Sequence, residues 1–299
     1  ANFDLANKYL VTLSLRADGS SLFREDKRWG YFPAAALAWK LKEEEFIKNI
    51  NFINDVKVRL GVGKTGQQDI TGTVGFYPST PLFTVGSNTS QYLDNSNLYS
   101  AIAYNEDLTW EKTTTYNLGI DFDLFKGNFL SGSFDIYKRE TNDLLARVPL
   151  PPGQGLSDTF IKNVGSTESK GFELEVTANP IPGLNLLVGY SNNDSKLNNL
   201  RPVTAGPENL INYWISYNLQ NATFKGLGLG FGGNYGDATD IYNNGTETFK
   251  LPSYAVINAA LYYDQPKYRV SLKVNNLTDE LYFNGYTTIN VQAPRTFMG

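Results

Sequence analysis

Apolar and polar residues alternate along many stretches of this chain. Between Lys8 and Arg16, every second residue from Tyr9 to Leu15 is apolar, and most residues between them are polar. A period of two places successive side chains on opposite faces and therefore predicts a β-strand. About ten residues suffice for a tilted strand to cross the hydrocarbon core of a bilayer. One apolar face and one polar face are typical of an outer-membrane β-barrel, with lipid outside and a polar lumen inside.

The same alternation recurs over the whole chain and predicts about eleven strands. They cover residues 8–16, 30–41, 55–62, 116–124, 133–136, 171–176, 184–192, 210–220, 227–235, 253–264 and 268–275, and another begins at 294–298. A soluble β-sandwich alternates too, but its strands are usually only about five or six residues long. The polar faces also carry charged residues such as Arg59, Asp121 and Glu173, which suit a water-filled lumen. We therefore expect an all-β, antiparallel transmembrane barrel rather than a sandwich.

The apolar face of this barrel should contact lipid. The residues expected there are Leu118, Ile120, Phe122, Phe172, Leu174, Val176, Val270 and Leu272. Short turns near 126–128, 180–183, 225–226 and 264–266 alternate with long polar loops near 66–113, 141–168, 193–209, 237–252 and 276–293. In outer-membrane barrels the short turns are periplasmic and the long loops extracellular. The segment 42–54 is the longer connection on the short side, and its residues Glu43–Ile47 could form a helical turn.

The composition removes several classes of function. The chain has 299 residues, with no Cys, no His and one Met. Thiol nucleophiles, thiolate metal sites and histidine bases are therefore absent, so we expect no enzyme, cofactor or metal site. A net charge of −4 argues against a nucleic-acid partner. Tyr and Phe are abundant, as in the aromatic girdles of barrels, although β proteins in general favour these residues.

Two motifs resemble catalytic or binding sites. Gly61–Gly66 resembles a phosphate-binding loop, but it has Val58 where that motif needs its first glycine, and no helix pattern follows. The carboxylate pairs Asp121/Asp123 and Glu173/Glu175 could serve a glycosidase. The simpler interpretation is a polar lumen lining, paired with Arg and Lys on neighbouring strands.

Several stretches resemble the TonB-dependent outer-membrane transporters, in particular the SusC/RagA-like group of Bacteroidetes. They are LRADGSS (15–21), RWGYFP (28–33), LGVGKTGQQDI (60–70), NEDLTWEKTT (105–114), NVGSTESKGFE (163–173) and VNNLTDELY (274–282). The resemblance spans nearly the whole chain. The stretches 207–217 and 227–235 look more similar to siderophore receptors.

This resemblance implies a barrel of roughly 22 strands around an N-terminal plug. Residues 1–299 look similar to the C-terminal half of that barrel, about 11–12 strands, and we expect the plug domain to be absent from this chain. A barrel cannot leave two open edges in lipid, so we expect these residues alone not to form a stable closed barrel. The implied partners are outer-membrane lipid, the TonB complex through the N-terminal part, and a SusD-like lipoprotein.

The implied function is TonB-driven import of a nutrient across the bacterial outer membrane, whether an oligosaccharide, a peptide or a ferric siderophore. A passive or structural, porin-like barrel is the alternative, and a soluble β-rich enzyme is a third. Candidate ligand-binding residues lie in the longest loop, 67–105, which carries the aromatic residues Phe76, Tyr77 and Tyr92. Aromatic rings among Ser, Thr and Asn suit all three nutrient classes, although they could equally pack the loop on itself. The lumen residues Arg59 and Glu173 are the second candidates.

Overall fold

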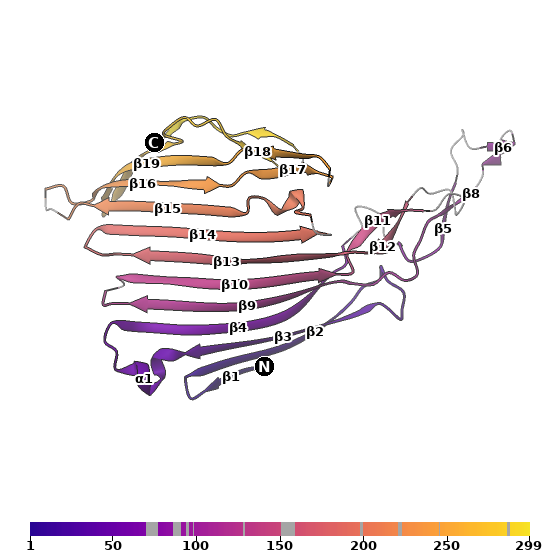
Figure 1. Ribbon diagram of the computed structural model, residues 1–299, viewed down its shortest axis with the longest axis horizontal. Helices are drawn as coiled ribbons and strands as arrows, with labels where there is room; N and C mark the ends of the chain where they lie inside the picture. Colours follow the sequence, from indigo (N-terminus) through magenta and orange to yellow (C-terminus); the bar gives the residue numbers. More distant parts are fainter. Residues whose placement is uncertain are drawn as a thin grey trace.

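The chain folds around one large antiparallel sheet of 13 strands, shown as a ribbon in Figure 1. The computed structural model describes residues 1–299 except 70–76, 86–90, 94–95, 98, 128, 151–158, 198–199, 221–222, 245 and 286–287. At 84–85, 91–93, 96–97, 99–101 and 243 it describes the backbone only. The strand order is β1-β2-β3-β4-β9-β10-β13-β14-β15-β16-β19-β20-β23, so each strand pairs with its neighbours along the chain once the loop hairpins are set aside. The sheet curves but does not close.

The alternation located the strands of this sheet correctly. They are β1 Asn2–Leu5, β2 Tyr9–Gly19, β3 Trp29–Lys40, β4 Ile53–Gln67, β9 Glu111–Leu124, β10 Leu130–Asn142, β13 Ser166–Ala178, β14 Leu184–Leu197, β15 Asn209–Asn218, β16 Leu227–Gly236, β19 Tyr254–Gln265, β20 Tyr268–Asn275 and β23 Thr296–Met298. The sequence analysis missed β1, which is only four residues long. Several strands also continue past their apolar stretch, because β pairing does not require alternation where both faces are wet.

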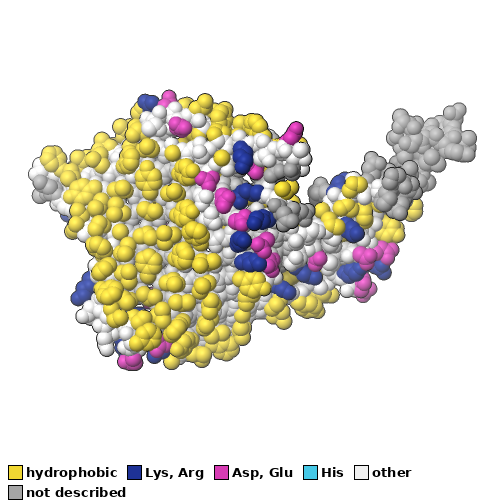
Figure 2. Space-filling model, in the orientation of Figure 1, with side chains coloured by type: hydrophobic (Ala, Val, Ile, Leu, Met, Phe, Trp, Pro, Cys, Tyr) yellow, Lys and Arg dark blue, Asp and Glu magenta, His cyan; other side chains and the backbone are white. Residues whose placement is uncertain are grey.

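The strand register gathers the apolar side chains on one face of the sheet. Ile120 on β9 lies opposite Val58 on β4 and Phe134 on β10, and Phe134 lies opposite Leu174 on β13. The eight residues expected on the apolar face share it, as their register shows. The edges of the sheet recede in Figure 1, so this face, drawn in Figure 2 as a continuous apolar band, is the convex one. Its side chains are exposed or half-buried, as expected for a surface that lipid covers.

The opposite, concave face carries the polar members of the alternation, including Arg59 and Glu173. The connections at one end of the sheet are short, and the glycines Gly127, Gly183 and Gly226 there have positive φ. The longer connection at that end contains η1 (Leu41–Glu43) and α1 (Glu45–Lys48), which confirms the predicted helical turn. No helix among the described residues is long and apolar enough to cross a membrane.

Glu44, between η1 and α1, fastens this connection to the sheet. Its carboxylate accepts hydrogen bonds from Lys8 Nζ at 2.9 Å, Trp39 Nε1 at 3.1 Å and Tyr9 Oη at 2.8 Å. The bond from Lys8, followed by those from Trp39 and Tyr9, lowers the pKa of Glu44 to about 2. The carboxylate therefore stays charged at every physiological pH.

The long connections at the other end contain short hairpins. These are β5 (Leu82–Val85) with β8 (Tyr99–Ile102), β6 (Gln91–Leu93) with β7 (Ser96–Asn97), β11 (Leu145–Pro149) with β12 (Thr159–Asn163), β17 (Thr239–Asn243) with β18 (Thr248–Leu251), and β21 (Phe283–Asn284) with β22 (Asn290–Val291). A single turn of 3-10 helix, η2 (Val203–Ala205), lies in the β14–β15 connection. The sequence analysis treated 67–105 as one long loop and did not predict the strands β5 to β8 within it, because these strands are too short to show alternation.

Six charged side chains cross the convex face beyond the apolar band. They are Lys138, Glu140, Glu168, Lys170, Asp194 and Lys196, from β10, β13 and β14. Lys138 Nζ lies 2.7 Å from Glu140 and 3.0 Å from Glu168, and Lys196 Nζ lies 3.3 Å from Asp194. Figure 2 shows basic and acidic side chains in a column beside the apolar band. This charged row marks where the convex face leaves the hydrocarbon on the long-loop side.

Candidate functional site

The concave face carries a cluster of charges around Arg59. Its guanidinium donates to Asp121 from Nε at 3.0 Å and from Nη2 at 2.8 Å, and Nη2 also donates to Asp135 at 2.9 Å. Lys57 Nζ lies 2.8 Å from Asp121, and Asn117 Nδ2 donates to Asp135 at 3.2 Å. Arg59 thus joins β4, β9 and β10. Because two carboxylates already neutralise its charge, Arg59 is better suited to stiffen the wall than to attract an anion.

A glycine makes this bridge possible. Gly119 lies opposite Arg59 on β4 and Asp135 on β10. A Cβ at Gly119 would come within 2.4 Å of Asp135 Oδ1 and 2.6 Å of Arg59 Nη2. The guanidinium therefore crosses β9 through space that only glycine leaves open.

Glu173 belongs to the same row of the concave face. Glu173 on β13 lies opposite Asp135, which in turn lies opposite Gly119 and, one strand further, Arg59. Three strand spacings separate Arg59 from Glu173, or about 14 Å. Among the described residues, Glu173 and its neighbour Glu175 form no ion pair. The predicted pairing of lumen carboxylates with Arg and Lys on neighbouring strands is therefore confirmed for Asp121. The carboxylates of Glu173 and Glu175 have no such partner among the described residues and could contact a ligand.

The loop candidates lie elsewhere. Tyr77 is 62% exposed, in the segment that leads into β5 on the long-loop side. Phe76 lies outside the described residues, and of Tyr92, in β6, only the backbone is described. The candidate residues therefore fall into two groups, one on the loops and one on the concave wall.

A hydrophobic core forms where three of the long connections meet, and we call it the loop junction. It consists of Leu22, Phe23, Phe32, Leu108, Trp110 and Ile161, none more than 7% exposed, with Leu145 against it. The Trp110 ring centroid lies 5.6 Å from that of Phe23 and 5.4 Å from that of Phe32. Residues from the β2–β3 loop, from the end of the β4–β9 connection and from β12 thereby pack together.

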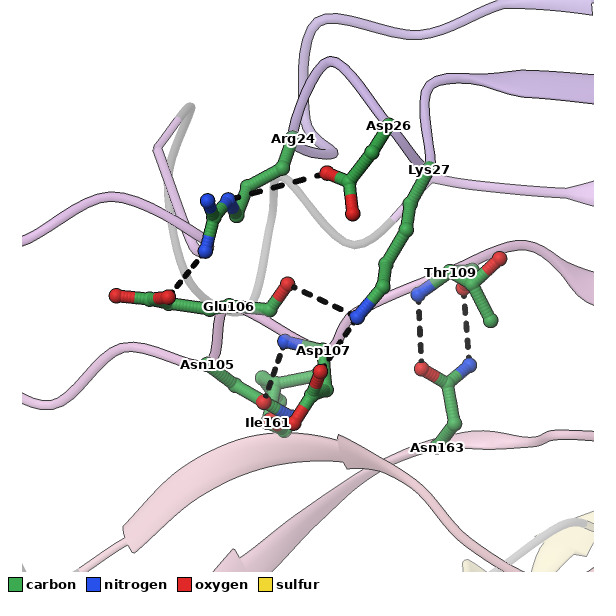
Figure 3. Close-up of polar contacts among 9 residues, drawn as sticks. All are labelled: Arg24, Asp26, Lys27, Asn105, Glu106, Asp107, Thr109, Ile161 and Asn163. Atoms are coloured by element: carbon green, nitrogen blue, oxygen red, sulfur yellow. Dashed lines mark hydrogen bonds and ion pairs between the residues drawn. The ribbon is translucent and has the colours of Figure 1, made fainter.

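Polar contacts surround the loop junction, and Figure 3 shows them. Asn163 Oδ1 accepts from the Thr109 amide at 3.0 Å while its Nδ2 donates to the Thr109 carbonyl at 2.9 Å. Asn105 Nδ2 donates to the Ile161 carbonyl at 3.0 Å. Lys27 pairs with Asp107 and holds the pKa of that carboxyl below its usual value of 3.8. Arg24 pairs with Glu106, so two ion pairs link the first loop to the second.

The sequence analysis recognised these residues by resemblance but missed their role. The stretch 105–114 carries both Leu108, which is fully buried, and Trp110. The sequence does contain a signal for this core. Leu22, Phe23 and Leu108 are apolar residues within polar loops, outside the alternating stretches. Gly66, the last residue of the stretch that resembles a phosphate-binding loop, has a packing role instead. A Cβ at Gly66 would lie 2.1 Å from the Phe32 ring.

Comparison with known proteins agrees with this architecture. The family described as TonB dependent receptor-like, beta-barrel matches residues 1–277. The TonB-dependent receptor SusC of Bacteroides thetaiotaomicron is 44% identical over 183 residues, which are 60% of this chain and 18% of that protein. The Ferrioxamine B receptor of Salmonella typhimurium is 24% identical over 216 residues, which are 67% of this chain and 29% of that protein. The matched stretches therefore span less than a third of these relatives, which are receptors rather than enzymes.

Solved structures share the fold. The RagAB peptide transporter superposes with a TM-score of 0.73 at 20% identity, over 92% of this chain and 42% of that chain. The ferripyoverdine receptor of Pseudomonas aeruginosa superposes with a TM-score of 0.66 at 16% identity, over 99% of this chain and 36% of that chain. At these identities the likeness concerns the fold alone.

Proposed function

Because this chain belongs to the TonB-dependent receptors and lies in the bacterial outer membrane, we propose that it forms the C-terminal half of the barrel of a nutrient importer. Energy would come from the TonB complex, through an N-terminal part that carries the plug. The match to the family over residues 1–277 is the observation that carries this proposal. A passive, porin-like barrel is the alternative.

The wall and loops suit uptake of a scarce solute. The loop junction gives the long connections a packed core, so they can present a defined surface rather than an unrestrained one. Below it, the concave wall offers Glu173 and Glu175 without charge partners among the described residues. A ligand would contact the loops first and the upper wall afterwards.

The nutrient belongs to one of three classes, an oligosaccharide, a peptide or a ferric siderophore. Relatives include a receptor for ferrioxamine B, and the RagAB transporter carries peptides. We propose that Phe76, Tyr77 and Tyr92 bind it on the loops and that Arg59 and Glu173 face it from the wall. A SusD-like lipoprotein is proposed as the partner above the loops, to be tested by co-purification with the tagged full-length protein.

Energy-dependent uptake is the decisive test. Cells with and without the full-length gene would receive radiolabelled maltohexaose, the hexapeptide Gly-Ser-Gly-Ser-Gly-Ser, or ferric ferrioxamine B. We expect gene-dependent uptake of one probe, which falls to background after deletion of tonB or addition of a protonophore. Uptake that persists without TonB would favour the porin-like barrel instead.

A second test locates the site. Deletion of residues 76–92 should abolish uptake while the barrel still assembles, as judged by its heat-modifiable migration on gels. Unchanged uptake at limiting ligand would move the site to the wall. Glu173→Gln should then reduce uptake more than Glu175→Gln, its matched neighbour two residues along the same face.

A further inference from the structure

A cleft of about 360 Å³ lies on the concave face at the long-loop end of β16, β19 and β20. The strand register shows that this is the same face as that of Glu173. Residues opposite one another on successive strands run from Glu173 through Ser191, Leu210 and Gly236 to Tyr254. The lining residues are Asn234, Tyr254, Val256, Asn258, Asn275, Asn276, Tyr282, Asn284, Gln292, Ala293, Pro294 and Thr296. The volume lies within the range of small-molecule sites, roughly 300–1,000 Å³.

The strands provide one wall of this cleft and a loop provides the other. Tyr282, Asn284 and Gln292 come from the β20–β23 connection, which contains the β21–β22 hairpin. Asn276, only 2% exposed, fixes this connection: its Oδ1 accepts from the Glu280 amide at 2.8 Å, and its Nδ2 donates to the Glu280 carbonyl at 2.9 Å and the Ala293 carbonyl at 3.3 Å. The cleft is therefore held in shape by the hydrogen bonds of one buried side chain.

Three of the six side-chain amides that line the cleft have no partner among the described residues. Those of Asn234, Asn275 and Asn284 form no hydrogen bond with any described part of the chain. Each offers two donors and one acceptor group, the combination that a hydroxyl group can satisfy in either role. None of the described residues that line the cleft is Lys, Arg, Asp or Glu. It therefore lacks the charge needed to select an ionic ligand.

Two tyrosine rings complete the surface. The rings of Tyr254 and Tyr282 lie 5.0 Å apart between centroids and are tilted by 35°. Gly236 makes room for the first, because a Cβ there would lie 2.8 Å from the Tyr254 ring. A tyrosine combines an apolar face with a polar tip. Such rings can cover the C–H face of a sugar ring while the amides bind its hydroxyl groups.

We propose that this cleft binds a neutral, polyhydroxylated ligand, an uncharged sugar unit of an oligosaccharide. The inference rests on the proposed import function and narrows its substrate class. The strands beneath the cleft are paired on both sides, β16 with β15 and β19, and β19 with β16 and β20. A peptide therefore finds no free edge on these two strands, although pairing with a strand edge is a common way for proteins to bind extended peptides. An anionic ferric chelate finds no cation.

Calorimetry on the purified full-length transporter in detergent tests the proposal. The probes are maltohexaose, cellohexaose and xylohexaose, with hexagalacturonic acid as the charged sugar and acetyl-(Gly-Ser)3-amide as the neutral peptide. We expect at least one neutral sugar to bind, and the charged sugar and the peptide to bind at least tenfold more weakly. Tyr254→Ala should weaken the sugar at least tenfold, and Asn234→Asp, which keeps the side-chain size, should also weaken it.

Tyr263→Ala is the matched control, because Tyr263 lies on the same strand β19 but opposite Val270 on the convex face. It should bind like the unmodified protein. Failure of every neutral sugar to bind, equal binding of the peptide or charged sugar, or unchanged binding by both cleft variants would overturn the proposal. Binding in detergent needs no TonB, so these outcomes are separate from the uptake experiment that tests import.

Discussion

The barrel wall and the loop junction are built by opposite rules. On the wall, large apolar side chains such as Leu229 and Val270 remain more than 60% exposed, because lipid rather than protein covers them. At the loop junction, Phe23 and Leu108 are almost completely buried, as in a water-soluble domain. The wall depends on the bilayer, whereas the loops carry a core of their own. The two regions should therefore fail independently when each is mutated.

Removal of the Trp110 side chain should have the largest effect. Trp110→Ala should destabilise the loop junction by about 3–5 kcal/mol, the usual cost of removing a buried aromatic ring. Hydrogen exchange and limited proteolysis between residues 20 and 28 would measure it, with barrel assembly intact. Trp29→Ala, at a ring that is 60% exposed, is the control. Loss of the barrel together with the loops would show that the two regions are not independent.

A charge on the convex face should be the next most costly change. Ile120→Arg should destabilise the full-length barrel in lipid vesicles by about 2–4 kcal/mol if it lies near the midplane, as measured by urea unfolding. Glu175→Arg, on the concave face, should cost much less. By alternation alone, Asp121 would have been an equally good control, but its ion pairs with Arg59 and Lys57 rule it out. Equal costs on the two faces would contradict the assignment.

A methyl group at Gly119 should disturb the wall from within. Gly119→Ala should break the Arg59–Asp135 contact and cost about 1–3 kcal/mol, typical of overpacking. Gly61→Ala is a sharp control, because a Cβ at Gly61 meets nothing within 4 Å. The same urea titration would compare them. Indistinguishable variants would mean that the Arg59 bridge contributes nothing to wall stability.

The smallest expected effect is the titration of Asp107 at the rim of the loop junction. Lys27 lowers the pKa of Asp107, so the stability that this pair contributes is present above the usual value of 3.8 and is lost as pH falls through the lowered pKa. Limited proteolysis should therefore cleave the loops of the Asp107→Asn variant slightly faster than those of the unmodified protein at pH 5. The difference between the two cleavage rates should vanish near pH 2. A difference that grows on acidification would contradict this sign.

Much of the wall could be predicted from sequence, and the family resemblance drawn from its motifs is confirmed. Alternation placed Ile120 and Arg59 on opposite faces because the side-chain period of a strand is two. The partner of Arg59 two strands away, Asp135, could not be predicted, since register depends on turns that pattern does not specify. The loop junction could not be predicted, because its residues come from three distant connections and from the start of β3 and follow no common period. The cleft around Tyr254 escaped for the same reason.

The charged row on β10, β13 and β14 also indicates how far the sheet extends beyond the lipid. Past Lys138, β10 continues to Asn142 as paired strand, and four residues at about 3.3 Å each add roughly 13 Å along the strand. The sheet thus rises above the lipid surface like a collar, and the β11–β12 hairpin starts from its rim. A solute that arrives from outside would meet protein before it meets headgroups. The part of the sheet beyond the charged row, rather than the membrane surface, therefore forms the outer end of the barrel.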